Sequence, residues 1–223
     1  MSVVVAIDGT AGSGKSTVAR GVGETLGLPV LDTGAMYRAV TLRVLRQHAD
    51  PSDPQACASV ARDAAVEVEA GRVRLDGEDV TTAIRRPEVT ATVSTVAAHP
   101  EVRAVLVARQ RDWVARHGGG VVEGRDIGTV VFPDATVKVF LTASTQERAR
   151  RRAAQEPDVA PGGDLDAVAE ALANRDRRDA ARTHSPLRPA ADALVIDTTR
   201  RRVADVVAEI VARVPAGARK DRP

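Results

Sequence analysis

The stretch from residue 3 to residue 17 reads VVVAIDGTAGSGKST, and it decides the fold class. Residues 3–7 form an apolar, largely β-branched run that predicts a buried strand. Residues 9–16 fit the pattern G-x-x-x-x-G-K-[ST], whose glycines let successive backbone N–H groups point at phosphate oxygens. Lys15 brings a charge to the β- and γ-phosphates, and the Ser16 hydroxyl can ligate Mg²⁺. The stretch therefore predicts a nucleoside-triphosphate site at the start of a helix.

Outward from this loop, short apolar strands alternate with helices. We expect strands at residues 3–7, 29–31, 120–123, 136–141 and 193–196. We expect helices at residues 15–26, 36–47, 55–65, 88–98, 100–116, 164–182 and 203–214, and one more opening with a capping box at residues 144–147. Five such strands joined by helices predict an α/β fold, with a parallel sheet covered on both faces and substrates at the carboxyl ends of the strands.

One segment departs from this pattern. Residues 66–69 and 73–75 alternate with period two around Ala70-Gly71-Arg72, which predicts an antiparallel hairpin. An antiparallel insert in a parallel α/β chain indicates a small lobe attached to the core. Residues 157–163 are rich in Pro, Gly and Asp and predict a mobile loop.

Composition narrows the class of protein further. The 223 residues carry 32 Lys and Arg against 30 Asp and Glu, a net charge of +2 that gives no strong preference for nucleic acid. The single Cys57 excludes an intramolecular disulfide and fits a reducing cytosol. No stretch approaches 18 apolar residues, and Met1 leads directly into a strand. We expect a cytoplasmic protein with neither a signal peptide nor a membrane span.

Three further segments indicate which class of phosphate-loop protein this chain resembles. Residues 32–38 read DTGAMYR, residues 123–133 read EGRDIGTVVFP, and residues 175–182 read RDRRDAAR. Together with the opening loop they closely resemble the bacterial cytidylate kinases, and the resemblance extends over almost the whole chain. The segment at 123–133 is far more specific than the phosphate loop. By contrast, the guanine-reading Asn-Lys-x-Asp element of GTPases is missing; its nearest approach, at residues 174–176, lies in a predicted helix.

The resemblance implies a single kinase domain over residues 1–223, with a monophosphate-binding lobe at 33–103 and a short lid at 150–165. It also implies a residue for each contact with ATP and with CMP or dCMP. The loop that cradles ATP comprises Gly9, Thr10, Ala11, Gly12, Ser13, Gly14, Lys15, Ser16 and Thr17. Arg38, Arg125 and Arg182 match arginines that hold the acceptor phosphate, and Thr33 belongs to the same substrate site.

For the rest of the acceptor, Ser94, Arg103 and Asp126 match positions that read the cytosine edge, while Arg175 and Asp179 match those that contact the pentose. Arg151 matches a lid arginine that closes over the transferring group; Arg151, Lys15 and the three phosphate arginines are the expected catalytic residues. One departure is Ala180, which stands where many relatives carry serine and affects only the pentose contacts.

The chemistry follows from the residue types. A nucleoside monophosphate has a second pKa near 6 and is already an oxyanion at pH 7, so no general base is needed. Catalysis then consists of aligning two polyanions and neutralising charge, which lysine, arginines and Mg²⁺ do. Asp32 is the first candidate to hold Mg²⁺ through water, beside Ser16, and Glu123 is the second.

Each feature also has a structural interpretation. Arg150–Arg152 can be a solvated helix face, and Arg175–Arg182 a helix with i,i+4 ion pairs. Tyr37 and Trp113 fit packing, and the four histidines lack metal-ligand spacing, so no zinc is expected. Three other functions stay open: a kinase for uridylate or shikimate, an ATP-binding module without turnover, and RNA binding, which lacks aromatic residues for stacking. We expect a monomer that binds neither nucleic acid nor membrane.

Overall fold

A computed structural model of the chain describes residues 2–69, 71–155 and 164–216. The chain divides into two compact units: residues 1–29 with 118–223, and residues 30–117. Within the described ranges, none of the helices is both long and apolar enough to cross a membrane. Each unit is built around a sheet of its own type, one parallel and one antiparallel.

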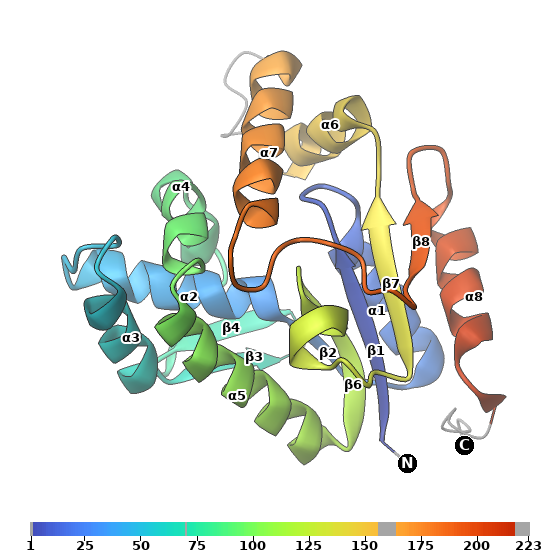
Figure 1. The fold of residues 1–223 in the computed structure, drawn as a ribbon, viewed down its shortest axis with the longest axis horizontal. Helices are drawn as coiled ribbons and strands as arrows, with labels where there is room; N and C mark the ends of the chain where they lie inside the picture. Colours follow the sequence, from blue (N-terminus) through green and yellow to red (C-terminus); the bar gives the residue numbers. More distant parts are fainter. Residues whose placement is uncertain (1, 70, 156–163, 217–223) are drawn as a thin grey trace. The chain divides into compact units, whose positions relative to one another are not determined.

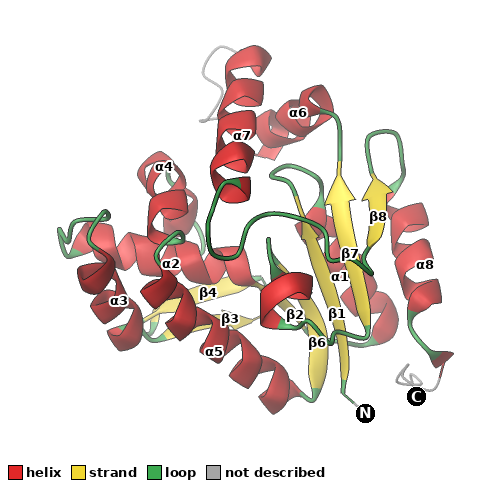
Figure 2. Cartoon of the chain, viewed as in Figure 1, coloured by secondary structure: helices red, strands yellow, loops and turns green. Residues whose placement is uncertain are grey.

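The first unit holds the parallel sheet. Its strands are β1 (Val3–Gly9), β6 (Gly119–Glu123), β7 (Val137–Thr142) and β8 (Leu194–Asp197). With β2 (Val30–Asp32), which begins the second unit, the strand order is β2-β6-β1-β7-β8, and Figure 2 shows these strands as arrows. In register, Val5 lies opposite Val121 of β6 and Val137 of β7, and β7 continues the parallel pairing to β8. The expected five-stranded parallel sheet is confirmed.

Helices α1 (Lys15–Leu26) and α8 (Val203–Arg213) pack against each other beside this sheet; Figure 1 shows α1 behind the strands and α8 to the right of β8. The buried face of α1 is Val18, Ala19, Val22, Gly23 and Leu26. Gly27 ends α1 with a φ of 65°, and its N–H donates to the Gly23 carbonyl. The apolar residues spaced by four and the terminating Gly27 predicted the bounds of α1, and the structure confirms them.

A second helix pair, α6 (Thr145–Gln155) and α7 (Leu165–Ala180), packs together in the same unit. The predicted capping box forms only in part. The Ser144 hydroxyl accepts the Glu147 N–H at 3.3 Å, but the Glu147 carboxylate binds Arg150 and Arg151 instead of returning to the cap. The predicted loop at 157–163 and half of the predicted lid, residues 156–163, lie outside the described residues.

The second unit surrounds a three-stranded antiparallel sheet, β3 (Val66–Glu69), β4 (Arg72–Leu75) and β5 (Glu78–Asp79). The predicted hairpin is confirmed, with Val68 paired to Val73. Its helices are α2 (Thr33–Arg46), α3 (Pro54–Asp63), the short 3₁₀ helix η1 (Ala83–Arg85), α4 (Pro87–Val96) and α5 (Pro100–His117).

The sequence did not predict three elements, one of which is the short helix η1; the other two are more informative. The first is β5, which has only two residues and therefore offers no alternation to detect. The second is η2 (Ile127–Val131), a five-residue π-helix that directly follows β6 and Asp126. Such helices are rare and frequently occur at functional sites. The predicted elements lie within three residues of their expected bounds, close to the usual uncertainty at element ends.

Candidate active site

The phosphate loop runs from the end of β1 to the start of α1 within the first unit. A side chain at Gly9 is impossible, because its Cβ would lie 2.0 Å from the Leu141 carbonyl oxygen of β7. Gly14 precedes α1 with a φ of 90°, in the left-handed region that favours glycine. Ser13 is fully buried, and its hydroxyl donates to the Thr10 carbonyl at 2.9 Å. The loop therefore has the tight curvature that its glycines predict.

Lys15 is folded over this loop, with its Nζ donating to the Thr10 carbonyl oxygen at 2.7 Å. Loss of hydration, followed by the nearby charge of Arg125, lowers the pKa of Lys15 to about 7. This value includes a smaller lowering by the charge of Arg175 and an opposing rise from the carboxylates of Glu123 and Asp176. Positive charges are thus concentrated around the loop, an arrangement that suits a polyanion.

Ser16, the next residue, donates its hydroxyl to Glu123 Oε2 at 2.8 Å. Glu123 ends β6 and is only 4% exposed. A hydroxyl beside a buried carboxylate is a hard-oxygen donor set of the kind Mg²⁺ binds, so these residues fit the expected ion. Asp32, the other candidate, lies in the second unit and serves as N-cap of α2, where it accepts the Ala35 N–H at 3.0 Å.

Arg125, Asp179 and Arg182 form an ion-paired cluster in the first unit. The Asp179 carboxylate is 2% exposed and binds Arg125 Nε at 3.1 Å through one oxygen and Arg182 through the other. Arg125 also donates to the Gly9 carbonyl at the start of the phosphate loop. The structure therefore brings together two of the three predicted phosphate arginines, and Asp179 orients both.

Arg151 of α6 also reaches the phosphate loop. Its guanidinium donates to Thr198 Oγ1 at 2.9 Å, to the Thr198 carbonyl at 2.8 Å and to the Ser13 carbonyl at 3.4 Å. Its neighbour Arg150 is largely exposed and pairs with Glu147 within the helix. Within the arginine run at residues 150–152, Arg151 is thus directed at the loop, whereas Arg150 is not.

Arg148 and Asp176, which the sequence did not single out, hydrogen-bond to the same loop. Asp176 Oδ1 accepts the Ala11 N–H at 3.1 Å, and Arg148 binds both the other Asp176 oxygen and the Ala11 carbonyl, at 3.2 Å. The Ala11 side chain packs with Ala149, Val168 and Leu172. Figure 1 shows α6 and α7 beside the loop that follows β1. Arg148 and Asp176 lie 28 residues apart in the sequence, so no local pattern predicts that they pair.

In the second unit, Arg38 of α2 is buried and donates to the Ile84 carbonyl at 3.1 Å and to Thr90 Oγ1 at 2.9 Å. It thereby joins α2 to η1 and α4. Thr33 is buried at the first position of α2, and Ser94 is buried in α4.

Arg103 of α5 is 5% exposed, and its guanidinium lies 5.4 Å from the centre of the Tyr37 ring. Arg103 also donates to the Ala97 carbonyl, at 3.4 Å. The stacking assigns Tyr37 a role beyond packing, because an aromatic face orients and stabilises a guanidinium. In the first unit, Asp126 is 4% exposed and Arg175 of α7 is partly buried.

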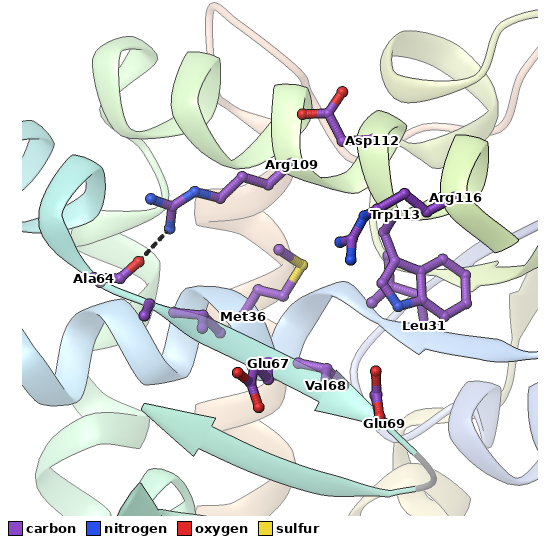
Figure 3. Close-up of a pocket in the computed structure, with 12 residues that line it drawn as sticks. Leu31, Met36, Ala64, Glu67, Val68, Glu69, Arg109, Asp112, Trp113 and Arg116 are labelled. Atoms are coloured by element: carbon purple, nitrogen blue, oxygen red, sulfur yellow. Dashed lines mark hydrogen bonds between the residues drawn. The ribbon is translucent and has the colours of Figure 1, made fainter. Parts of the chain in front are cut away.

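A cavity of about 360 Å³ lies within the second unit (Figure 3), and none of the predicted site residues lines it. Its walls include Met36, Trp113 and Arg109. Arg109 donates to the carbonyl oxygens of Ala64 at 2.6 Å and Arg62 at 2.8 Å, which satisfies the last turn of α3. The charge of Arg109 thus has a structural task, and Trp113 is buried as expected.

The parallel sheet, the phosphate loop and the arginines around it define the class: this chain is a P-loop kinase, an enzyme that transfers a phosphoryl group. The family can be stated as well. A sequence model described as cytidylate kinase matches residues 5–216, and the chain belongs to the cytidylate kinase family.

Individual relatives agree with this assignment. The cytidylate kinase of Mycolicibacterium paratuberculosis is 50% identical over 209 residues, which cover 92% of each chain. That of Pelotomaculum thermopropionicum is 50% identical over 223 residues and 97% of each chain. Two solved structures share the fold. One is an uncharacterized protein from Eubacterium ventriosum, with a TM-score of 0.54 and 12% identity over 96% of this chain and 99% of the other. The second is a gluconokinase from Sinorhizobium meliloti, with a TM-score of 0.51 and 14% identity over 96% of this chain and 91% of the other. The expected family is confirmed.

Proposed function

We propose that the enzyme transfers the γ-phosphoryl group of ATP to CMP or dCMP, giving ADP and CDP or dCDP. The observation that carries this proposal is the arginine cluster of Arg125, Asp179 and Arg182, joined through the Gly9 carbonyl to the ATP-binding loop. Membership of the cytidylate kinase family supports the identity of both substrates. A module that only bound ATP would have no use for a second set of buried, oriented phosphate ligands.

In the reaction, a phosphate oxygen of the acceptor attacks the γ-phosphorus, and the bond from that phosphorus to the β,γ-bridging oxygen breaks. Lys15 stabilises charge on the β- and γ-phosphates, while Arg38, Arg125 and Arg182 hold the acceptor phosphate. Arg151 neutralises the transferring group from the lid side. Because the acceptor is already ionised, the chain has to position the groups and exclude water rather than move a proton.

Mg²⁺ is proposed to bind at Ser16 with support from Glu123, since these two residues share a hydrogen bond. When bound, the ion neutralises charge on the ATP phosphates. The hydrogen bond favours Glu123 over Asp32 for this task, because Asp32 caps α2 with one of its oxygens.

The cytosine base is proposed to be read by Ser94, Arg103 and Asp126. Cytosine offers an amino donor at N4 and an acceptor at N3, whereas uracil has an acceptor at O4 and a donor at N3. A carboxylate only accepts and a guanidinium only donates, so Asp126 and Arg103 complement cytosine and oppose uracil. Arg175 and Asp179 are proposed to contact the pentose, and Thr33 to belong to the acceptor site.

The organisation of the protein is proposed to follow its family. Residues 33–103 would form the monophosphate lobe and residues 150–165 the lid, of which 156–163 lie outside the described residues. We also propose a cytoplasmic, monomeric enzyme. The buried, single Cys57 is consistent with a reducing compartment.

The acceptor profile tests this function. Release of ADP is measured with CMP, dCMP, UMP, AMP and shikimate as acceptors, and CMP and dCMP are expected to be phosphorylated most efficiently. Asp126→Ala should lower kcat/KM for CMP by roughly one to two decades and change UMP turnover little. Asp134→Ala, an exposed carboxylate eight residues away, is the matched control. An unchanged ratio of CMP to UMP turnover in Asp126→Ala would contradict the assignment of the base-reading residue.

A further inference from the structure

Asp8, the residue before the phosphate loop, binds a distant segment through both of its carboxylate oxygens. Asp8 Oδ1 accepts the Ile127 N–H at 2.8 Å, and Oδ2 accepts the Gly128 N–H at 2.8 Å. These are the first two amides of η2, which would otherwise lack partners within the helix. Asp8 is 4% exposed, so no water can replace it without a rearrangement.

The segment that Asp8 holds directly follows the residues proposed to bind the acceptor. Arg125 and Asp126 immediately precede the two bonded amides. The same end of β1 fixes this segment twice more: the Gly124 N–H donates to the Ile7 carbonyl at 3.0 Å, and Arg125 donates to the Gly9 carbonyl. Three successive residues of β1 thus bind the chain on both sides of Arg125 and Asp126.

This arrangement is unfavourable for the carboxylate itself. Burial and, to a smaller extent, the neighbouring charge of Asp126 raise the pKa of Asp8, while the two amides and the charge of Lys15 lower it; the resulting pKa is about 6. Among the described residues, Asp126 and Lys15 are the charged groups whose charges act on Asp8. A buried charge that reduces stability is retained most readily where it serves a function, and two aligned amide bonds indicate which function.

We propose that Asp8 is a positioning residue for the acceptor nucleotide, fixing through Ile127 and Gly128 the backbone from which Arg125 and Asp126 reach it. The proposal deepens the proposed function and rests on it, since Arg125 and Asp126 are assigned there to the acceptor phosphate and the base. Both carboxylate oxygens of Asp8 bind the segment after Asp126, and Asp8 acts on Lys15 of the phosphate loop only through its charge. Its main effect should therefore fall on the acceptor.

Asp8→Asn tests this role with almost no change in volume. The asparagine oxygen accepts one amide, but its NH₂ group then faces the second N–H, so one charge-assisted hydrogen bond is lost and the segment shifts. We expect the KM for CMP to rise by about tenfold or more, with the KM for ATP within about twofold of the wild type. The preference for CMP over UMP should fall in parallel, while the melting temperature stays the same or rises.

Asp53→Asn is the matched control. Asp53 also accepts two backbone amides, those of Gln55 and Ala56, as the N-cap of α3. Asparagine caps a helix about as well as aspartate, so this variant should keep both KM values.

The outcomes separate the explanations. A purely structural Asp8 would lower the melting temperature and leave the KM for CMP and the CMP to UMP preference unchanged, and that result overturns the proposal. An equal rise in both KM values also overturns it. A wild type that fails to phosphorylate CMP refutes the proposed function instead. If Asp8→Asn does not fold, the KM of the wild type for CMP is measured from pH 7.5 to 5.5 and corrected for the second phosphate pKa of CMP. A corrected KM that does not change with pH overturns the proposal.

Discussion

Replacing Asp179 with asparagine tests how the acceptor-phosphate arginines are oriented. The carboxylate is 2% exposed and pairs with Arg125 and Arg182, whose side chains are 17% and 9% exposed. Asparagine keeps the shape and one acceptor, so Asp179→Asn loses one of two charge-assisted hydrogen bonds. Such a bond contributes about 1.5–3 kcal/mol. Since 1.4 kcal/mol corresponds to tenfold, kcat/KM for the acceptor should fall about 10- to 150-fold.

The assay compares CMP with dCMP in wild type and in Asp179→Asn. If Asp179 mainly orients the two arginines, both acceptors lose activity by a similar factor, because both carry the same phosphate. If Asp179 serves only as a ligand of the ribose 2′-hydroxyl, the loss is confined to CMP. Retention of wild-type activity toward dCMP would therefore refute the orienting role. The exposed Asp134→Asn provides the control for the same chemical change.

Three further predictions concern the phosphate loop and its surroundings. Lys15→Met should keep a native circular dichroism spectrum but lose roughly 3–4 kcal/mol of transition-state stabilisation, so that kcat falls at least about a hundredfold. Lys138→Met is the control. If Lys15→Met kept a third of the wild-type activity, Lys15 would not lie at the phosphates. Glu123→Gln should raise the Mg²⁺ concentration needed for half-maximal rate, and an unchanged titration would exclude Glu123 from the metal site. Raising the pKa of Asp8 from 3.8 to about 6 means that the folded state keeps a proton which the unfolded state has lost, so stability falls as pH rises from 4 to 6 and stays low above 6. Between pH 4 and 6, the free energy of unfolding of Asp8→Asn, measured in urea, should therefore rise by up to about 3 kcal/mol relative to that of the wild type. A difference in unfolding free energy that does not change with pH would contradict the raised pKa of Asp8.

Local patterns were enough to predict most of the fold. The helix at residues 15–26 follows from its apolar stripe and from Gly27, and the hairpin follows from the alternation of Val66–Glu69 with Arg72–Leu75. Both signals lie within a dozen residues. The π-helix at Ile127–Val131 was missed because its amides are satisfied by Asp8, about 120 residues earlier, and no local pattern encodes that contact.

The candidate site divides in the same way. The glycines and Lys15 could be predicted from their spacing, since the backbone conformation of the loop demands them. The residues that orient the functional groups could not. Asp176 binds the Ala11 amide from a helix 165 residues away, and Tyr37 supports Arg103 across 66 residues. A carboxylate or a tyrosine in a helix is ordinary by itself, and only the fold shows what it contacts.

Transfer of the γ-phosphoryl group from ATP to a cytidine monophosphate can be followed directly. The most direct measurement follows ATP labelled at the γ-phosphate in the presence of Mg²⁺ and CMP. We expect the label to appear at the β-phosphate of CDP, one for each ADP formed, and little free phosphate to accumulate. Label that appears only as inorganic phosphate, or that stays in ATP despite bound CMP, would contradict the proposed transfer.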